Sequence, residues 1–487
     1  MGIPQEKIVK TKIVCTLGPA SDDPETLRRM INAGMDVCRQ NFSHGDHSYH
    51  EKLFHRVREL AHDCGEQVSI LCDVQGPKIR TGLVKEPFTL RTGDFIKVTP
   101  EPVLGTPECV QIRYPTILKD LDVGDTIFIN DGIVKLVVRE KLPRALSCEV
   151  EAGGMISDHK GCNIPSGNVS IEVPTEKDEE DLALIAQLDP EFVAASFIGS
   201  ARDVEKVREC LHENGNKDVK IISKIERPVA LKNLDEIIAV SDGLMVARGD
   251  LGVEIPPYEV PIAQKTIVRR CNREGRPVIV ATQMLESMTT QSRPTRAEAN
   301  DVFNAVLDGA DAVMLSGETS VGKYPVEAVR FMDDIVSTAE RFMPQRDPDY
   351  YDSSSQTEVE TIGHACFTIA NEFHDLNWPG KILAVTDSGY TARMISKYRP
   401  GLPIVALTAN LRTARELNLV WGVRAVYSED VVGANLEERA INAIVRAFSM
   451  GLLATEDHVV VVSSSMIDRS WGTFTGVYDV GKVLRTR

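Results

Sequence analysis

Short apolar runs alternate with amphipathic stretches of helical length along most of the chain, beginning at Lys12. The eight apolar runs have the length of buried strands and read IVCTLG, MDVCRQNFS, VSILCDVQG, FVAASFI, KIISKIE, GLMVARGD, VIVATQMLE and AVMLSGE. Between them, helix starts are marked by Asp23 before Pro24 and by the capping-box pair Thr295 and Glu298. Eight strand–helix units in succession predict a (β/α)8 TIM barrel, whose reactive groups gather on the loops after the strands.

The alternation stops once, between Arg80 and about Pro165, where short strands with turn signals follow one another without a helical period. We therefore expect a small β-barrel domain, residues 79–165, inserted after the third strand of the large barrel, which itself takes residues 1–78 and 166–345. The segments GPKIRTG and HKGCNIP are the expected hinges. A domain tethered beside the reactive end of a barrel can act as a lid.

After the eighth strand the sequence predicts one more helix, YPVEAVRFMDDIVSTAERF, and then a polar, Ser-rich linker at Asp347–Glu360. From about Thr361, helical and strand-like segments alternate again, with the strands ILAVTDSG, PIVALT, AVYS and HVVVVSSS. Residues 346–487 are therefore expected to form a third domain, of α/β type.

The composition is that of an ordinary globular protein: 43% of the 487 residues are hydrophobic and 26% are charged. The net charge of −16 argues against a nucleic-acid-binding surface, which needs clustered Lys and Arg. No run approaches the ~18–20 apolar residues of a membrane span, the amino terminus has no apolar signal core, and the 10 cysteines show no CxxC spacing. We expect reduced cysteines, a cytoplasmic location, and neither nucleic acid nor membrane as a partner.

Charged residues close two of the apolar runs: Lys224 and Glu226 follow Val219–Ile222, and Asp250 follows Gly243–Ala247. If these strands are neighbours in a parallel sheet, two carboxylates and an ammonium meet at one rim. A divalent cation together with an anionic substrate would neutralise such a cluster. A purely structural ion-pair cluster is the alternative, and the residues alone weigh the two about evenly.

Seven motifs follow one another along the predicted barrel: RQNFSHG, DVQGPKIRTG, IISKIE, MVARGDLGVEIP, ATQMLESM, RPTRAEANDV and LSGETSVGKYP. In these motifs the chain resembles the pyruvate kinase family, and the resemblance runs from end to end. It implies a barrel, a small inserted β domain and a carboxy-terminal α/β domain, in agreement with the pattern above. It also implies a homotetrameric phosphotransferase of glycolysis, which moves a phosphoryl group between phosphoenolpyruvate and ADP to give pyruvate and ATP.

The resemblance implies a role for each residue at the rim. Glu226 and Asp250 would bind Mg²⁺ or Mn²⁺, and Lys224, on the same side of an extended strand as Glu226, would stabilise the transferring phosphoryl group. Arg39, at the end of the second strand, would grip the phosphate of phosphoenolpyruvate. The backbone N–H groups of Gly249 and Asp250 would hold the substrate carboxylate region.

The family pattern extends to the proton transfer and to the nucleotide. Thr282 would lie near the methylene carbon, and the ATQ loop, with Ser316 and Glu318 across the rim, would organise the water that protonates the enolate. Four residues match phosphate contacts or the entrance of the nucleotide site: Asn41, His44, Arg80 and Lys160. Without the resemblance, capping a turn would be the expected role of His44.

One departure from the family changes the expected cofactors. Many members read DTKGPEIRTG and bind K⁺ in a pocket that corresponds here to Asn41, Ser43, Asp73 and the carbonyl of Val74. This chain reads DVQGPKIRTG, so that Lys78 replaces the glutamate and Val74-Gln75 replaces Thr-Lys. A fixed ammonium would repel K⁺ by ~1 kcal/mol or more and supply the positive charge itself. We expect activity without added K⁺.

A second phosphate site is expected in the last domain. TDSGYTAR (Thr386–Arg393) follows a strand and opens a helix, so its N–H groups and hydroxyls can cradle a phosphate. In the family this loop helps to bind phosphorylated effectors, assisted by a loop that corresponds to Ser470–Gly476. The implied contacts are Thr386, Ser388, Gly389 and Thr391. A plain turn between strand and helix is the equal alternative.

GETSVGK (Gly317–Lys323) has the spacing of a phosphate-binding P-loop, but Tyr324 takes the place of the Ser or Thr that holds Mg²⁺. The segment also closes the series of strand–helix units instead of opening a nucleotide fold. We therefore expect an ordinary barrel loop.

Two other functions stay open at this point. A Mg²⁺-dependent lyase or aldolase that uses a pyruvate enolate would share Glu226 and Asp250, but would have no use for Arg80, Lys160 or the inserted domain. A non-catalytic sugar-phosphate sensor would use Thr386–Arg393, and the intact Lys224 argues against it.

Overall fold

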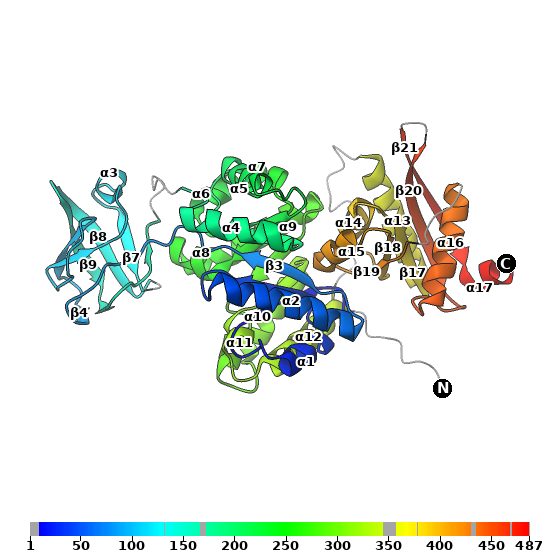
Figure 1. The fold of residues 1–487 in the computed structure, drawn as a ribbon, viewed down its shortest axis with the longest axis horizontal. Coiled ribbons are helices and arrows are strands. Elements are labelled where there is room, and N and C mark those ends of the chain that lie inside the picture. Colours follow the sequence, from blue (N-terminus) through cyan, green and yellow to red (C-terminus); the bar gives the residue numbers. More distant parts are fainter. Residues whose placement is uncertain are drawn as a thin grey trace.

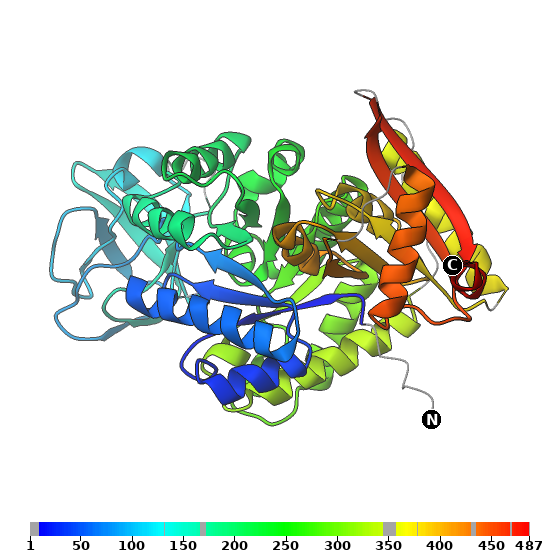
Figure 2. The same cartoon turned by 45° about the vertical axis from the view of Figure 1, so that its right-hand side comes forward.

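The chain folds into three bodies that lie in a row, with a parallel barrel in the middle (Figure 1). The computed structural model describes residues 9–130, 132–165, 172–343, 357–376, 378–429, 435–467 and 470–486. The small β domain lies at one end of the barrel and the carboxy-terminal domain at the other, and the turned view in Figure 2 shows the same order.

Eight parallel strands close the central barrel in the order β1-β16-β15-β14-β13-β12-β3-β2. They are β1 (Lys12–Thr16), β2 (Val37–Asn41), β3 (Ser69–Asp73), β12 (Phe192–Ala195), β13 (Lys220–Ile225), β14 (Gly243–Ala247), β15 (Val278–Ala281) and β16 (Ala312–Leu315). Each strand falls within or overlaps one of the eight apolar runs, so the predicted (β/α)8 barrel is confirmed.

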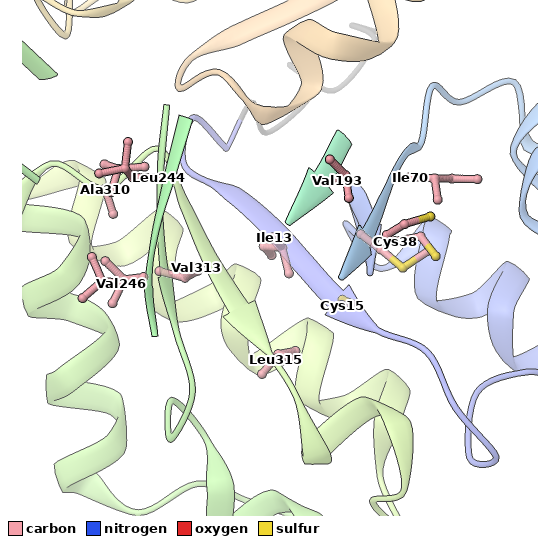
Figure 3. Packing of buried hydrophobic residues seen from close by; sticks show 14 of the residues in the cluster. Ile13, Cys15, Cys38, Ile70, Val193, Leu244, Val246, Ala310, Val313 and Leu315 are labelled. Carbon is pink, nitrogen blue, oxygen red and sulfur yellow. The ribbon is translucent and has the colours of Figure 1, made fainter. Parts of the chain in front are cut away.

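Helices follow the strands and cover the outside of the barrel (Figure 1). They are α1 (Pro24–Asn32), α2 (His47–Cys64), α4 (Glu176–Leu188), α5 (Ala201–Glu213), α6 (Pro228–Lys232), α7 (Leu234–Val240), α8 (Arg248–Glu254), α9 (Val260–Arg273), α10 (Arg296–Asp308), α11 (Gly317–Ser320) and α12 (Pro325–Arg341), with single 3-10 turns η1 (Pro257–Glu259) and η2 (Glu286–Thr289). Asp23 caps α1, and Thr295 and Glu298 form the predicted capping box of α10. Apolar side chains such as Ile13, Val246 and Leu315 fill the space under the helices (Figure 3).

The alternation of side chains along each strand separates the barrel interior from the layer under the helices. On β3, Ile70 and Cys72 belong to the apolar cluster under the helices, whereas Leu71 belongs to the cluster inside the barrel. Asp73, two residues beyond Leu71, continues the interior face at the carboxyl end of the strand. The sequence therefore places apolar residues deep in the barrel and polar ones at its carboxyl end.

The inserted domain is built from short antiparallel strands and one parallel pair. Its elements are β4 (Phe88–Leu90), β5 (Phe95–Thr99), β6 (Cys109–Gln111), α3 (Ile117–Asp120), β7 (Thr126–Ile129), β8 (Val134–Leu142), β9 (Ala145–Ala152), β10 (Gly154–Ile156) and β11 (Cys162–Asn163). Six strands pair in the order β11-β7-β8-β9-β5-β6 and two form the ribbon β10-β4. Bridges from Arg80 to Gly161 and from Thr81 to Ile112 join the two outer strands of the six. The first hinge therefore closes the ring, as a small β-barrel requires.

The carboxy-terminal domain is a five-stranded sheet between helices. Its elements are α13 (Glu358–Asp375), β17 (Gly380–Val385), α14 (Tyr390–Ser396), β18 (Ile404–Thr408), α15 (Leu411–Glu416), η4 (Leu417–Leu419), β19 (Val423–Tyr427), α16 (Leu436–Ser449), β20 (His458–Ile467), β21 (Ser470–Asp479) and α17 (Val480–Arg485). The strand order is β19-β18-β17-β20-β21, with only the β20–β21 pair antiparallel. The predicted α/β architecture is confirmed.

One local prediction in this part of the chain is wrong, and another differs at its end. Ser470–Gly476, expected as a loop, belongs to β21, which pairs along its whole length with β20. The predicted linker Asp347–Glu360 lies mostly outside the described residues, and its last three residues form the first turn of α13, which begins at Glu358.

The carboxy-terminal domain reaches into the floor of the barrel. Leu419 is fully buried and belongs to the apolar cluster inside the barrel. Around it, Arg399 donates to the carboxylate of Asp311, at 2.9 Å, and the N–H of Trp421 donates to the same carboxylate at 3.1 Å. All ten cysteines are free thiols, as expected. Within the described residues, no helix combines the length and the apolar character of a membrane span.

Candidate active site

Polar side chains from neighbouring strands meet inside the carboxyl end of the barrel. Arg39, on β2, donates from Nε to Asp73 on β3, at 2.7 Å, and from Nη1 to the hydroxyl of Thr16 on β1, at 2.9 Å. Asp73 also accepts from the ammonium of Lys224, at 3.2 Å. Burial alone would raise the pKa of Asp73, but Arg39 and Lys224 outweigh it and hold this pKa below its ordinary value. The carboxylate therefore stays charged and fixes both cations.

Lys224 is the centre of this cluster. Besides Asp73 it contacts the hydroxyl of Ser196, at 2.7 Å, and its Nζ lies 2.9 Å from Oε1 of Glu226. Burial alone would lower the pKa of Lys224, yet the two carboxylates of Asp73 and Glu226 hold it above its ordinary value. A cation is thus held in a buried position, as the alternation along β13 predicted for residues 224 and 226.

Glu226 is buried, and one of its oxygens lacks a hydrogen bond. Oε2 accepts the N–H of Phe197, at 2.7 Å, whereas Oε1 has only the nearby Lys224 charge and no aligned donor. Burial, opposed by Lys224 and reinforced by Asp250, raises the pKa of Glu226 to about 7. A carboxylate in this state has an oxygen that a bound cation would satisfy.

Asp250 supplies the second carboxylate of the expected metal site. It lies exposed in the first turn of α8, directly after β14, and β14 pairs in parallel with β13. Among the described residues, no group of three or more His, Cys, Asp and Glu side chains is arranged to hold a metal. Mg²⁺ does not need such a group, because it takes one or two carboxylates and fills its other positions with water and substrate oxygens. Glu226 and Asp250 therefore fit Mg²⁺ better than a metal that requires a protein cage.

The end of β15 carries strained backbone. Thr282 and Gln283 have φ of 67° and 55°, in the left-handed region that a β-branched residue such as Thr rarely adopts. The Thr282 hydroxyl donates to the carbonyl of Ala281, at 2.6 Å, and accepts the N–H of Gly249, at 2.8 Å. Thr282 is thereby fixed against the first turn of α8, next to Asp250. The Gly249 N–H, expected to face the substrate, is engaged with Thr282 in this structure.

Ser316 and Glu318 lie together after β16. Glu318 is buried and accepts two backbone N–H groups, from Ser316 at 2.7 Å and from Leu285 at 2.9 Å. Burial raises its pKa, although these bonds oppose the shift. The Ser316 hydroxyl is buried without a partner, so it is available to a water molecule or a ligand. GETSVGK forms the short helix α11 in this barrel loop, as expected, and not a P-loop before a nucleotide fold.

Of the residues expected at the nucleotide, Arg80 and Lys160 lie in the two segments that join the inserted domain to the barrel, whereas Asn41 ends β2 and His44 lies in the loop after it. Arg80 donates to the carbonyl of His159, at 3.0 Å, and the N–H of Lys160 donates to the hydroxyl of Thr81, at 2.9 Å. His44 is exposed, and burial together with the charges of Lys78, Arg39 and Arg80 lowers its pKa. The charges of Lys78, Arg39 and Arg80 are therefore felt at His44, in the loop after β2, where an anion would be attracted. On the other hinge strand, Asn163 donates to Glu254 of α8, at 3.0 Å.

The groups expected to bind K⁺ already have protein partners. Oδ1 of Asn41 accepts the N–H of Ser43, at 3.2 Å, and the carbonyl of Val74 accepts the Ser196 hydroxyl, at 2.8 Å. Asp73 is occupied by Arg39 and Lys224. The end of Lys78 reaches solvent, but partial burial of the side chain lowers its pKa, while the nearby Asp250 and Asp73 oppose the shift. The oxygens expected to bind K⁺ thus already accept hydrogen bonds from protein groups, and positively charged side chains lie near them.

The expected effector loop lies apart from this cluster, between β17 and α14 of the carboxy-terminal domain. Gly389 has φ of 75°, which favours glycine, and its N–H donates to the hydroxyl of Thr386, at 3.0 Å. Asp387, in the same loop, is paired with Arg439 at 3.0 Å. Thr391 is buried in α14. These hydrogen bonds are made within the loop and to Arg439, as in an ordinary turn between a strand and a helix.

Three residues of the cluster were not found from the sequence: Thr16, Ser196 and Phe197. Thr16 and Ser196 lie two residues beyond the interior residues Val14 and Ala194, so the alternation rule was sufficient to place both. Phe197 contributes its backbone N–H, which donates to Glu226, and its φ is 59°. No pattern of side chains in the sequence predicts such a backbone contact.

Two family models match the chain: "Pyruvate kinase, barrel domain" over residues 8–329 and "Pyruvate kinase, alpha/beta domain" over residues 360–474. The chain belongs to the pyruvate kinase family. It is 41% identical to the pyruvate kinase of Bacillus licheniformis over 484 residues, which are 98% of this chain and 81% of that protein. It is 45% identical to the pyruvate kinase of Sporosarcina psychrophila over 420 residues (85% and 71%) and 42% identical to that of Geobacillus stearothermophilus over 470 residues (95% and 79%).

The pyruvate kinase resemblance drawn from seven motifs is thereby confirmed, and with it the function of a glycolytic kinase. The site agrees with such chemistry, because phosphoryl transfer asks a protein mainly to position anions and to neutralise their charge. Cations from β2, β13 and the lid hinge converge on one end of the pyruvate kinase barrel.

Proposed function

We propose that this chain catalyses phosphoryl transfer from phosphoenolpyruvate to ADP, giving pyruvate and ATP, at the carboxyl end of its barrel. The observation that carries the proposal is the buried Lys224, which lies 2.9 Å from Glu226 and 3.2 Å from Asp73. Without ligands, the cations Arg39 and Lys224 balance the anions Asp73 and Glu226. A metal bound there would make the site positive, as a trianionic substrate requires.

Glu226 and Asp250 would hold Mg²⁺ or Mn²⁺. When bound, the metal supplies positive charge that lowers the cost of the anionic oxygens of both substrates. Glu226 fits this task because its Oε1 is buried without a hydrogen bond. Asp250 fits it because it is exposed on the loop side of the barrel, where the substrate enters.

Arg39 and Lys224 act on the phosphoryl group. Arg39 uses Nε and Nη1 for Asp73 and Thr16 and, among the described residues, has Nη2 left for the phosphate of phosphoenolpyruvate. Lys224 places its ammonium on the oxygens of the group in transfer, where negative charge must be neutralised. Its three oxygen neighbours keep the ammonium in one place before the substrate binds.

Thr282 lies where the enolate must be protonated, and the backbone of Gly249 and Asp250 holds the substrate carboxylate. The Gly249 N–H would then be shared between the Thr282 hydroxyl and the ligand. A water held by the unpartnered Ser316 hydroxyl and the buried Glu318 delivers the proton to the methylene carbon.

ADP enters at the lid hinge, where Arg80 and Lys160 contact its phosphates and Asn41 and His44 line the entrance. K⁺ is dispensable, because Lys78 supplies an ammonium near Asp73 and Asp250, and because the oxygens of Asn41, Asp73 and Val74 already accept hydrogen bonds from Ser43, Arg39, Lys224 and Ser196. Both statements rest on the family pattern together with the positive charges near His44 described above.

The chain assembles as a cytoplasmic homotetramer, as the resemblance implies. The exposed large apolar side chains include two sets: Tyr258 in η1 with Ile262 in α9, and Leu376, Trp378 and Val477 in the carboxy-terminal domain. Contacts between subunits would bury both sets. A phosphorylated effector binds Thr386, Ser388, Gly389 and Thr391. Sedimentation of the purified chain tests the tetramer, and isothermal titration with fructose bisphosphate and sugar monophosphates tests the loop.

A coupled assay for pyruvate from phosphoenolpyruvate and ADP, with and without Mg²⁺, tests the function. We expect Mg²⁺-dependent activity that falls about 10²–10³-fold in Lys224→Met, with a smaller change in KM. Pyruvate release without ADP would show hydrolysis of phosphoenolpyruvate and not phosphoryl transfer to ADP. No turnover of the folded, metal-loaded chain would refute the proposed reaction.

A further inference from the structure

The strained pair Thr282 and Gln283 has one neighbour that holds both residues. The guanidinium of Arg248 donates from Nη2 to the carbonyl of Thr282, at 2.6 Å, and reaches the carbonyl of Gln283, at 3.5 Å. Its Nε donates to the carbonyl of Ala281, at 3.3 Å. One planar side chain therefore spans three consecutive carbonyl groups at the point where β15 turns into the left-handed region.

Arg248 is itself held from the opposite side. Nη1 lies 2.8 Å from both carboxylate oxygens of Asp301 on α10, and 3.4 Å from the side-chain oxygen of Gln264 on α9. The side chain of Arg248 is only 10% exposed. Because two helices fix the guanidinium, it can in turn fix a loop whose own backbone preferences oppose the observed conformation.

Arg248 also controls the other partner of Thr282. It is the first residue of α8, so that its backbone carries Gly249 and Asp250. The Thr282 hydroxyl accepts the Gly249 N–H at 2.8 Å. The side chain and the backbone of one residue thus hold the two elements that Thr282 joins, the strained turn and the first turn of α8.

We propose that Arg248 is a positioning residue for the proton-transfer half of the reaction: it holds Thr282 and Gln283 in the left-handed conformation and so sets the Thr282 hydroxyl beside the methylene carbon. This inference rests on the proposed function. The step concerned forms the methyl C–H bond of pyruvate, as the carbon of the enolate takes a proton from water. Among the described residues, neither Arg39 nor Lys224 hydrogen-bonds to Arg248, so we expect a change of Arg248 to leave phosphate binding nearly unaltered.

Two variants test the proposal. Arg248→Ala removes the whole group, and Arg248→Lys keeps the charge but offers a point charge that cannot span three carbonyls. We expect kcat for pyruvate formation to fall about 100-fold in both, with KM for phosphoenolpyruvate nearly unchanged. Exchange of the pyruvate methyl protons with D₂O, followed by NMR in the presence of Mg²⁺ and ATP, should fall by the same factor.

Chemical rescue separates positioning from a general loss of structure. Free guanidinium ion at tens of millimolar, with ionic strength held constant by NaCl, should restore activity to Arg248→Ala and not to Arg248→Lys. Arg270→Met is the matched control, because Arg270 makes an exposed ion pair with Asp235 in the last turn of α9, and it should keep full activity.

The inference is overturned if Arg248→Lys, folded by circular dichroism, keeps wild-type kcat and proton exchange, or if guanidinium restores nothing to a folded Arg248→Ala. If Arg248→Ala does not fold, the Lys variant alone decides. A wild-type chain that forms no pyruvate would remove the proposed function instead, which is a separate outcome.

Discussion

Ser196 is a neutral side chain that stabilises a buried charge, that of Lys224. Its hydroxyl accepts a hydrogen bond from Lys224, at 2.7 Å, and donates to the carbonyl of Val74, at 2.8 Å. The carbonyl of Val74, the hydroxyl of Ser196 and the ammonium of Lys224 therefore form a chain of hydrogen bonds. Each bond polarises the next, which stabilises the positive charge of Lys224. At this carbonyl, where the resemblance implied a K⁺ ligand, the chain has a hydroxyl at hydrogen-bond distance, and the ammonium of Lys224 is bonded to that hydroxyl.

Ser196→Ala should lower both activity and stability. The variant removes a hydrogen bond to a charged group, which contributes about 1.5–3 kcal/mol, so we expect a loss of that size in urea unfolding and about tenfold in kcat. Ser223→Ala is the control, because Ser223 lies on β13 and makes a buried, neutral hydrogen bond to Ser241, at 2.7 Å. It should cost about 0.5–1.5 kcal/mol and leave kcat unchanged. Equal effects of both variants on kcat would contradict the role of Ser196.

Lys78→Glu should create a requirement for K⁺. The change replaces an ammonium near Asp250 and Asp73 with a third carboxylate, and the resulting negative charge needs a cation. In tetraalkylammonium buffer we expect the wild-type chain to be active and the variant to recover activity only when K⁺ is added. A wild-type rate that collapses without K⁺ would show that Lys78 does not replace the ion.

At the level of elements, η2 and α10 are joined by one carboxylate. Glu298 completes the capping box of α10 with Thr295 and also accepts the N–H and hydroxyl of Ser287, at 2.7 and 2.6 Å. Ser287 lies in η2, on the loop that begins with Thr282. The cap of a helix therefore also anchors the loop that carries a proposed catalytic residue.

Glu298→Gln should weaken the protein in a pH-dependent way. Burial would raise the pKa of Glu298, but hydrogen bonds from Ser287 and Thr295 outweigh it, and its pKa lies below the ordinary 4.5. The charged form is thus favoured by folding, so its stabilisation is present at neutral pH and is lost as pH falls through the folded pKa. We expect the variant to unfold with about 0.5–1.5 kcal/mol less free energy at pH 7, and with a deficit that shrinks as pH falls through the folded pKa.

Urea titrations at several pH values measure this difference. Glu327→Gln, in the exposed first turn of α12, is the control and should change stability little at any pH. A Glu298→Gln deficit that is the same at pH 3 and pH 7 would exclude the proposed cause.

At the level of the whole molecule, the barrel depends on the domain that follows it. Leu419 completes the apolar cluster at the floor of the barrel, and Asp311, directly before β16, holds Arg399 and the backbone of Trp421. Two domains that share a cluster in this way should unfold together. The inserted domain has an apolar core of its own, and among the described residues that core contains no side chain from the barrel.

Leu419→Ala should uncouple the barrel from the carboxy-terminal domain. Removing a fully buried Leu costs about 2–5 kcal/mol, and here the cavity opens into the barrel. We expect calorimetry to resolve two transitions in place of one for these two domains. Leu402→Ala, in the core of the carboxy-terminal domain alone, is the control and should lower only the transition of that domain. A single, equally shifted transition for both variants would contradict the coupling.

Much of this molecule follows from the period of two along its strands. Buried strands read as apolar runs, and residues two apart share a face, which placed Lys224 beside Glu226. What the sequence could not supply depends on backbone conformation and on distant contacts. The residue types of Thr282 and Gln283 do not predict their positive φ values. The sequence around Leu419 does not predict that this side chain packs inside the barrel of another domain.

The error at Ser470–Gly476 has a different origin. A loop was expected there by analogy with a family function, and the local alternation of SWGTFTGVYD, which is typical of a strand, was not weighed against it. The structure pairs these residues with β20. The metal-binding, nucleotide-binding and effector roles assigned from the family stay predictions that the experiments above address.

The way the first hinge closes the small ring has a mechanical result. Arg80 is paired with Gly161, and Thr81 with Ile112, so both residues belong to the β-barrel of the inserted domain and not to a free linker before it. If the inserted domain rotates against the barrel, Arg80 and Lys160 would move with it, and both cations would shift together relative to the mouth of the barrel. Distance between a fluorophore on the ring and one on α2 would then report nucleotide capture directly.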